Sequence, residues 1–524
     1  MRVWLLTTLV VALLAAALVG AAVLTWPRGT LSPSGSGLAR VSLPGFAGHV
    51  ESVQAVTAGS RPVAVVLRDG TVFPLASLAQ GRRLTVSVSI RRPSWIGWLV
   101  GRQTTRTLRL VTPSVRPAAQ LLSPARGARV VVRYPEPVAR VRVGNAAVRT
   151  LATPSTAVPL GPVAAGAASS GTAFVAVAPR AWEQLGKPVR VSWFVRGTKP
   201  QAQLVAAPAA GALLAPDDSL TLTFSRPVSD VLGSRLPRLE PVTPGQWTQA
   251  DAHTLVFRPG TFGLPLGATL HVHLPRPALV GGHSSRLLTW HVRQGSELRL
   301  QQLLARLGYL PVRWRGASDP PKTPAAELAA AVSPPAGTFS WRYAKVPAPL
   351  RALWQPGQAN EITRGAVMAF EDEHGLATDG IAGPLVWHAL LEADLAGHRH
   401  TGGYSYVFVH ATVPESLNLW HNGKVIVTSP GNTGIPAAPT PFGTWPVFEH
   451  ISVGTMSGTN PDGSHYNDPG VQWISYFHGG DAIHAFPRAS YGTPQSLGCV
   501  ELPLAAAAQV WPYTPIGTLV TVES

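Results

Sequence analysis

Short runs of β-branched residues, separated by Gly and Pro, recur through residues 39–293 and limit what this chain can fold into. Examples are Val63–Leu67, Leu84–Ile90, Thr107–Val111 and Val130–Tyr134. Runs of this length and composition are typical of strands rather than helices. Because a chain of 524 residues is longer than one hydrophobic core normally supports, we predict a multidomain, mainly β protein.

Pro-rich and Gly-rich stretches near residues 113–117 and 197–200 divide this region into three predicted β modules, at 39–115, 116–197 and 198–293. The third contains Leu220–Val228, Thr254–Pro259 and Thr269–Leu274 at sandwich spacing, and it resembles a bacterial immunoglobulin-like domain. The resemblance implies a spacer. His271 and His273 alternate on one strand face, but no third ligand accompanies them, so we expect surface histidines and no metal site.

The N-terminal residues 3–26 are almost wholly apolar, uncharged and free of Pro. A run of this length can cross a hydrocarbon core of about 30 Å, and Arg2 in front of it favours a cytoplasmic N-terminus. We predict a signal anchor, a single transmembrane helix at 1–26, in the bacterial cytoplasmic membrane. A linker at 27–38 and the extracytoplasmic remainder follow it. A signal peptide cleaved after Val19-Gly20-Ala21 is the alternative.

The formal charge of +17 is unevenly distributed along the chain. Residues 401–524 hold two basic residues, Lys424 and Arg488, against seven acidic ones, a net charge of −5, so the first 400 residues carry +22. A basic chain can bind nucleic acid, but no nucleic-acid motif is present and the export signal favours an anionic membrane surface or cell wall.

Near residue 294 the apolar pattern becomes helical, with Leu300, Leu303, Leu304 and Leu307 on one stripe. A Pro-rich insertion at 311–358 precedes a second helical part, whose Gly375–Gly383 segment contains Asp379 and leads to Trp387. The region 294–395 resembles the small three-helix peptidoglycan-binding domain. The resemblance implies that a groove beside Asp379 and Trp387 binds peptidoglycan glycan; a helical spacer without binding is the alternative.

Cys499 is the only cysteine of the chain, and it lies fifteen residues after His484 in a strand-like segment. It is either a small buried hydrophobe or a reactive thiol, and a thiol needs a base such as His to become a nucleophile. Gly498 permits close approach of a substrate, and the backbone N–H groups around it can receive an oxyanion. The spacing therefore favours a cysteine acyl-transfer enzyme.

The residues around this pair resemble the L,D-transpeptidase catalytic domain of the YkuD type. The family carries Ile-His-Gly, then Ser-His-Gly-Cys-Val-Arg, and an upstream Thr-Pro-x-Gly-x-aromatic turn that reads Thr440–Trp445 here. Three positions depart from the pattern: Ala485 replaces Gly, Leu497 replaces the second His, and Glu501 replaces Arg. The resemblance implies a small β sandwich or barrel over 404–524, with one short helix at 505–510.

The resemblance also implies a mechanism for cell-wall cross-linking. Cys499 would attack a peptidoglycan stem peptide with His484 as base, while Ser496 and Gly498 shape the loop. No cofactor is needed. On the substrate side we place Arg488, Glu501, Ala485, His478 and Tyr476, with Arg488 taking over the carboxylate contact and Glu501 either pairing with it or facing a cationic group. His478 is a candidate for the role of the missing second His, and His465 and Tyr466 would belong to a polar lid loop. An L,D-carboxypeptidase and a catalytically weakened wall-binding protein are the alternative functions.

Overall fold

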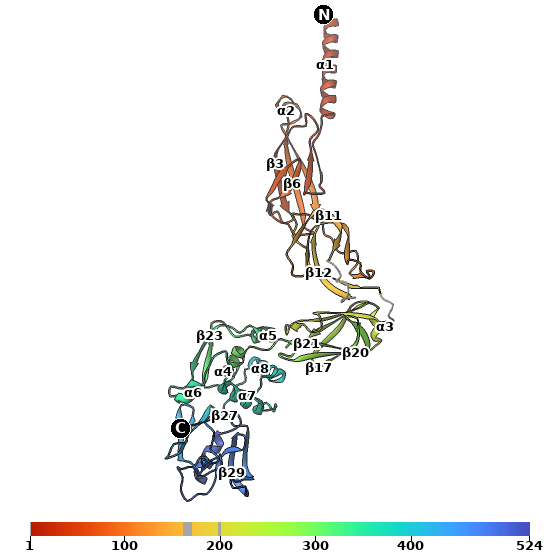
Figure 1. The fold of residues 1–524 in the computed structure, drawn as a ribbon. Coiled ribbons are helices and arrows are strands. Elements are labelled where there is room, and N and C mark those ends of the chain that lie inside the picture. Colours follow the sequence, from red (N-terminus) through yellow and green to blue (C-terminus); the bar gives the residue numbers. More distant parts are fainter. Residues whose placement is uncertain (1, 161–169, 197–200) are drawn as a thin grey trace. The chain divides into compact units, whose positions relative to one another are not determined.

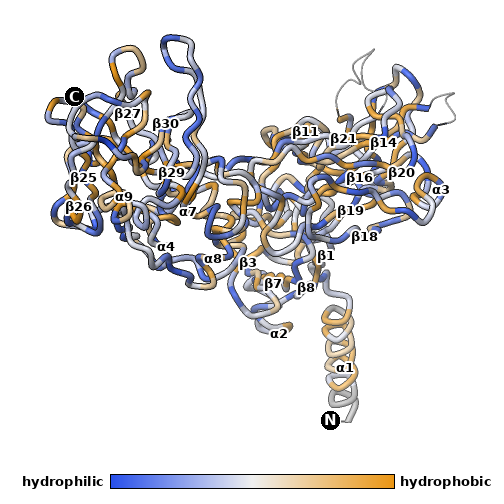
Figure 2. The backbone as a smooth tube through the Cα atoms, turned by 90° about the horizontal axis from the view of Figure 1, so that it is seen from below, coloured by the Kyte–Doolittle hydropathy of each residue, from blue (hydrophilic) through white to orange (hydrophobic). Residues whose placement is uncertain are grey.

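The computed structural model describes residues 2–160, 170–196 and 201–524, and its secondary structure is mainly β. It begins with helix α1 (Arg2–Leu24), which is coloured largely as hydrophobic in Figure 2. Among the residues whose side chains are described, no helix combines the length and the hydropathy that a membrane span requires. Contacts group the chain into two compact units, one of residues 1–205, 223–226 and 278–284, the other of residues 206–222, 227–277 and 285–524.

The first module of unit one is built from two small sheets, in the strand orders β1-β2-β6-β5 and β4-β3-β7-β8. Val72, Val86 and Val88 are fully buried between them. Strand β1 lies within the stretch 27–38 that we predicted to be a linker and pairs with β2, so part of that stretch belongs to the sheet. The elements are β1 (Thr30–Pro33), β2 (Ala39–Ser42), β3 (His49–Thr57), β4 (Pro62–Val63), β5 (Val65–Arg68), β6 (Thr71–Pro74), β7 (Arg83–Arg91), α2 (Ser94–Val100) and β8 (Gln103–Val111).

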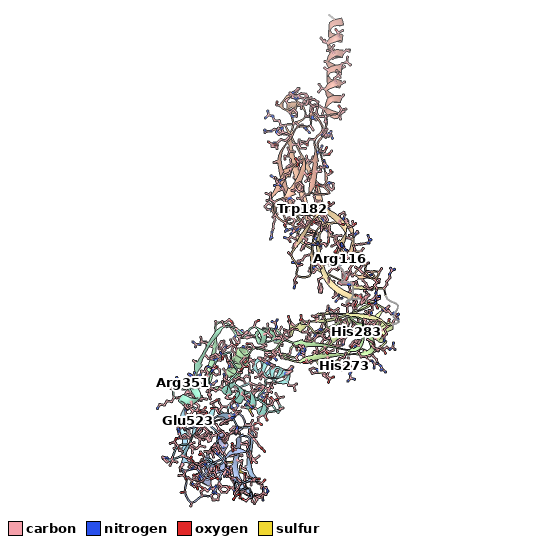
Figure 3. All side chains as sticks on the ribbon, in the orientation of Figure 1. Arg116, Trp182, His273, His283, Arg351 and Glu523 are labelled. Carbon is pink, nitrogen blue, oxygen red and sulfur yellow. The ribbon has the colours of Figure 1, made fainter. Side chains whose placement is uncertain are left out.

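The second module is one sheet in the order β11-β10-β12-β13-β9. Its strands are β9 (Leu121–Leu122), β10 (Val131–Val143), β11 (Arg149–Pro159), β12 (Ser170–Ala178) and β13 (Val189–Phe194). Trp182, labelled in Figure 3, packs against the first module, and its indole nitrogen donates to Ser36 O at 2.8 Å. The two modules therefore share contacts within this unit.

Residues 203–292 form the strands of the predicted third module. They are β14 (Gln203–Ala207), β15 (Leu213–Leu214), β16 (Leu220–Phe224), β17 (Arg238–Glu240), β18 (Gly245–Asp251), β19 (Thr254–Pro259), β20 (Thr269–Val280) and β21 (His283–Val292), with helix α3 (Val228–Leu232). His271 and His273 lie on the more exposed face of β20, as predicted, and His273 is labelled in Figure 3. His271 bonds to Thr289 and His273 to Glu240, and the described residues contain no cluster of three or more metal-ligating side chains.

The helical region of unit two follows the pattern of its apolar residues. Leu300, Leu303, Leu304 and Leu307 are buried along α4 (Glu297–Leu307), which ends at Gly308 in a left-handed conformation (φ 99°). Asn360 caps α7 (Glu361–Glu373) by accepting from Thr363 N, and Pro384 begins α8 (Pro384–Ala396). The insertion at 311–358 is part of the same core, because its elements β22 (Val312–Gly316), α5 (Pro324–Val332), β23 (Gly337–Trp341) and α6 (Ala348–Ala352) bury Val312, Leu328 and Leu350 against the helices.

Residues 405–523 form two sheets with a core between them. The first has the order β26-β25-β24-β32-β27 and the second β28-β29-β30-β31. Their strands are β24 (Ser405–His410), β25 (Ser416–His421), β26 (Lys424–Pro430), β27 (Gly443–Pro446), β28 (Glu449–Thr459), β29 (His465–His478), β30 (Asp481–Ala485), β31 (Val500–Leu502) and β32 (Leu519–Glu523). The expected helix is α9 (Leu504–Val510), followed by the 3-10 turn η1 (Trp511–Tyr513). Val409, Leu419, Ile483 and Val500 are buried in the shared core.

The helical region and these sheets share a second core, in which Tyr406, Trp420 and Leu519 pack with the helices. Helix α7 contacts β27 and β32, and Figure 1 shows α7 beside β27. The closest approach is between two glycines, since a Cβ added at Gly365 would lie 2.4 Å from Gly517 O. The helical region is thus packed directly onto the sheets that carry Cys499.

Candidate active site

Cys499 lies directly before β31, on a loop that ends at one edge of the second sheet. Its side chain is partly exposed, and its Sγ lies 3.8 Å from Gly480 O. It packs beside Ile451, Met456 and Tyr476 of the β28–β29 hairpin. The thiol is therefore reachable from solvent but has an apolar wall on one side.

The loop that presents Cys499 is held by three hydrogen bonds, two made by Ser496 and one by Thr440. Ser496 Oγ donates to Cys499 O at 2.5 Å and accepts from Gly498 N at 3.2 Å. Thr440 Oγ1 donates to Gly498 O at 2.7 Å, which ties the Thr440–Trp445 turn to the loop. Gly498 has φ 119°, a region that L side chains avoid, so Gly is required here. Because Gly498 N–H already donates to Ser496, it is a weaker candidate oxyanion donor than we predicted.

His484 lies on β30, which runs parallel to β31 and pairs Ile483 with Val500 and His484 with Glu501. The ring is buried, and Nδ1 lies 3.0 Å from Ala485 O. Since a carbonyl oxygen only accepts, Nδ1 carries the proton and Nε2 keeps its lone pair. Burial lowers the pKa of His484, so the ring is neutral at neutral pH and available as a base. Ala485, which we placed on the substrate side, orients the imidazole through its backbone carbonyl.

The thiol and the imidazole do not form an ion pair in this structure. Burial, together with the nearby carboxylates of Asp481 and Glu501, raises the pKa of Cys499 to about 12. Within the described residues no hydrogen bond joins Cys499 to His484. The resting pair is therefore a neutral thiol beside a neutral imidazole.

Asp481 is a site residue that the sequence analysis missed. Its carboxylate packs against Gly498, where an added Cβ would lie 2.1 Å from Oδ1, and its Oδ2 lies 3.1 Å from His478 Nδ1. Burial raises the pKa of Asp481, and His478 opposes that shift. The signal was available as a His and an Asp three residues apart across Gly479-Gly480, a turn that folds the two side chains together.

His478 therefore reaches the nucleophile loop only through Asp481. Its ring packs against Trp445, with centroids 4.7 Å apart. Together with Trp445 and Asp379 it lines a pocket of about 300 Å³ between α7 and the catalytic sheets. The structure pairs His478 with a carboxylate rather than with Cys499, which differs from the role of a second catalytic His.

Arg488 and Glu501 form a bidentate ion pair beside the site. Arg488 Nε donates to Glu501 Oε2 at 2.8 Å and its NH2 donates to Oε1 at 2.7 Å. The same NH2 donates to Gln495 O at 3.2 Å, and the guanidinium lies 4.7 Å from the centre of the Phe486 ring. We predicted that Glu501 either pairs with Arg488 or faces a cationic group of the substrate, and the structure contains the pairing with Arg488.

The β28–β29 hairpin covers the apolar side of the thiol. Tyr476 packs beside Cys499, and burial followed by the charge of the Cys499 sulfur raises the pKa of both Tyr476 and Tyr466. We predicted a polar loop at His465 and Tyr466, but both residues lie in β29, paired with Thr459 and Gly458. The side chains along β29 alternate between more and less exposed positions, as in a strand. The sequence did not reveal this strand because the same residues include Asn, Asp, Gly and Pro.

The two residues predicted to contact glycan have different surroundings. Asp379 lies on a surface turn and its Oδ1 accepts from Ile381 N at 2.8 Å. Trp387 is only 3% exposed, and its ring fills the space above Gly295, where an added Cβ would lie 2.2 Å from it. Trp387 is therefore a core residue and cannot form a binding groove with Asp379.

Comparison with known families identifies the C-terminal region. Residues 405–522 match the L,D-transpeptidase catalytic domain, YkuD, so this segment is a domain of that family. A comparison with curated proteins found no match.

Among solved structures, the catalytic domain of an Enterococcus faecium L,D-transpeptidase is 27% identical over 23% of this chain and 96% of its own, with a TM-score of 0.21. An L,D-transpeptidase from Mycobacterium smegmatis is 15% identical over 62% of this chain and 100% of its own, with a TM-score of 0.21. One from Mycobacterium tuberculosis H37Rv is 13% identical over 62% and 98%, with a TM-score of 0.20.

Proposed function

We propose that this protein is a cell-wall L,D-transpeptidase that forms peptidoglycan cross-links through an acyl-enzyme on Cys499. The family match over 405–522 supports the reaction class. The observation that carries the proposal is the orientation of His484, whose Nδ1–H is held by Ala485 O so that Nε2 is free to take a proton. Its strand is paired directly with the one that follows Cys499.

The proposed reaction proceeds in two acyl transfers. Cys499 attacks the carbonyl of the third stem residue while its proton passes to His484 Nε2, and a bond from sulfur to carbon forms. The carbon–nitrogen bond to the terminal D-alanine then breaks, and His484 returns the proton to the leaving amine. An amine from a second stem then attacks the thioester and loses its proton to His484. The carbon–sulfur bond breaks, and His484 returns that proton to the sulfur of Cys499, which restores the neutral pair.

The neutral resting pair determines how the thiol is activated. With its pKa raised to about 12, Cys499 is a thiol at neutral pH, so deprotonation must accompany attack rather than precede it. His484 is suited to this because burial keeps it unprotonated. Of the backbone N–H groups of Gly498 and Cys499, that of Gly498 already donates to Ser496 Oγ, so the N–H of Cys499 is the proposed oxyanion donor.

Arg488 is proposed to contact the substrate carboxylate. Its NH1 has no hydrogen bond within the described part of the chain, and its side chain is 31% exposed. The Glu501 side chain is 5% exposed, and Arg488 is its only ion-pair partner among the residues that the structure describes. Arg488→Ala alone would therefore leave a buried carboxylate unpaired. The appropriate variant is Arg488→Ala with Glu501→Gln, compared with Glu501→Gln alone. We expect the double variant to lose about ten- to a hundredfold more in kcat/KM for the tetrapeptide.

Location and wall attachment are proposed on separate grounds. The apolar run at 3–26 behind Arg2 supports a membrane anchor with the catalytic domain outside the cytoplasm. Recovery of the chain as soluble protein beginning near Ala22 would show that the segment is cleaved instead. Binding of peptidoglycan by 294–395 remains a proposal, now without Trp387.

The deciding experiment is product analysis on purified muropeptides. Full-length protein should convert tetrapeptide donors to cross-linked dimers with release of D-alanine, Cys499→Ala should be inactive, and His484→Ala nearly so. Release of D-alanine without dimers would assign an L,D-carboxypeptidase. If no stem peptide turns over and a carbapenem does not acylate Cys499, the protein is a wall-binding relative without activity.

A further inference from the structure

A second site lies in the helical region, on the side where the insertion folds against α4. A pocket of about 500 Å³ there is lined by five arginines from four separate segments: Arg299, Arg306, Arg313, Arg342 and Arg399. We call it the arginine pocket. Trp314 and the 316–321 turn complete its wall. Its volume is that of a small-molecule site.

Only part of this positive charge is neutralised by the protein. Arg299 pairs with Glu327 and Asp394, and Arg306 pairs with Asp394. Arg313, Arg342 and Arg399 have no carboxylate partner among the described residues. The one acidic residue in the lining, Asp319, is 92% exposed and lies 3.9 Å from Lys322. The pocket thus carries an excess of about three guanidinium charges.

The pocket also contains guanidinium donors that a ligand could reach. The side chain of Arg313 is exposed and makes no hydrogen bond within the described chain, while Arg342 donates to Ala305 O and Arg399 to His398 O, both backbone oxygens. Charge-assisted hydrogen bonds to an ionised acceptor are stronger than those to a neutral carbonyl. Three arginines without a carboxylate in one pocket therefore favour an anionic ligand.

We propose that the arginine pocket binds a phosphate group carried on a sugar, as found in an anionic phosphorylated glycan. A phosphate matches the unneutralised guanidinium groups better than a carboxylate, because it carries up to two charges and three acceptor oxygens. The pocket is larger than a phosphate alone requires, and the half-buried Trp314 offers the sugar an aromatic surface. The site is separate from Cys499 and does not depend on the proposed reaction.

The test is isothermal titration of the full-length protein with glucose 6-phosphate, inorganic phosphate, glucuronate, glycerol 3-phosphate and glucose. We expect glucose 6-phosphate to bind most tightly, glucose not to bind, and the affinity to fall as NaCl rises. Equal binding of glucuronate would refute the phosphate preference. Equal binding of inorganic phosphate would refute the sugar, and tighter binding of glycerol 3-phosphate would point to a lipid headgroup instead.

Two arginines on one strand provide matched variants. Arg313 and Arg315 are both exposed on β22, but only Arg313 lines the pocket. Arg313→Gln should weaken glucose 6-phosphate binding about tenfold or more, while Arg315→Gln, with the same loss of charge, should change it little. Equal effects of the two variants, or no binding by the unmodified protein, would overturn the proposal. Muropeptide turnover without glucose 6-phosphate should be unchanged in both variants.

Discussion

The protonation state of Cys499 can be tested directly, because it is the only cysteine in the chain. The perturbation is pH, and the readout is the rate of alkylation by iodoacetamide, a small neutral reagent. In the folded protein the pKa of Cys499 is raised from 9.0 to about 12 by burial and by the neighbouring carboxylates. The same chain unfolded in urea provides the reference, since its thiol has an ordinary pKa.

The expected magnitude follows from that difference in pKa. At pH 8 the folded protein should contain about a thousandfold less thiolate than the unfolded chain. A thiolate of higher pKa is intrinsically more nucleophilic, which should increase its own rate constant roughly fifteen- to thirtyfold. The two effects together should make alkylation of the folded protein about thirty- to sixtyfold slower than that of the unfolded chain. Its rate should also rise about tenfold per pH unit from pH 7 to pH 10 without a plateau.

The slope separates this reasoning from simple steric protection, which lowers the rate equally at every pH. His484→Ala is the matched control, because a neutral imidazole that makes no hydrogen bond to the sulfur should not alter the slope. A plateau near or below pH 8 in the unmodified protein, lost in His484→Ala, would show that Cys499 and His484 form an ion pair. The concerted proton transfer proposed for the first step would then be wrong.

Three further substitutions test contacts described above. Asp481→Asn removes a charge that raises the pKa of Cys499, so iodoacetamide should react faster at every pH below 10; an unchanged rate would mean that the carboxylate does not act on the thiol. Gly365→Ala places a Cβ 2.4 Å from Gly517 O and should destabilise the fold by about 1–3 kcal/mol, measured as a lower midpoint in urea. Burial raises the pKa of Glu371 to about 7, so its contribution to stability is complete below its ordinary value of 4.5 and is lost as pH rises through 7. The free energy of unfolding of Glu371→Gln, relative to that of the unmodified protein, should therefore be higher at pH 8 than at pH 5, by about 1.4 kcal/mol for each unit of the pKa shift. The same relative free energy at pH 5 and pH 8, measured in urea, would contradict this.

Much of the fold could be predicted from local patterns. The β-branched runs Val63–Leu67, Leu84–Ile90, Thr107–Val111 and Val130–Tyr134 overlap strands β5, β7, β8 and β10, and the helix expected at 505–510 is α9. The β28–β29 hairpin was missed because Gly454, Gly458 and Pro469 interrupt the pattern that marks a strand. The pairing of β28 with β29 depends on contacts between the two strands, which the local pattern of one segment does not show.

The sequence was less informative about burial and pairing at the sites. Trp387 was placed at the surface because its motif suggested a groove, whereas the close approach of Gly295 shows that its ring fills a core. The spacing of His478 and Asp481 across Gly479-Gly480 predicts that these two side chains meet, but it does not predict that Asp481 lies against the Cys499 loop. Its role becomes visible only when the parallel pairing of β30 with β31 brings its carboxylate against Gly498. Residues of this kind depend on three-dimensional contacts between segments.

The two departures from the motif at 497 and 501 can be understood together. Leu497 replaces a polar ring and Glu501 replaces a cation, so the nucleophile segment has lost both groups. In the structure Asp481, which is paired with His478, lies against Gly498, and Arg488 forms a bidentate ion pair with Glu501. His478, Asp481 and Arg488 come from the single stretch 478–488 that also carries His484. Because the segment that holds the base also supplies the charged groups, a substitution there should alter substrate recognition and proton transfer together, whereas one at Leu497 should affect only the packing of the loop.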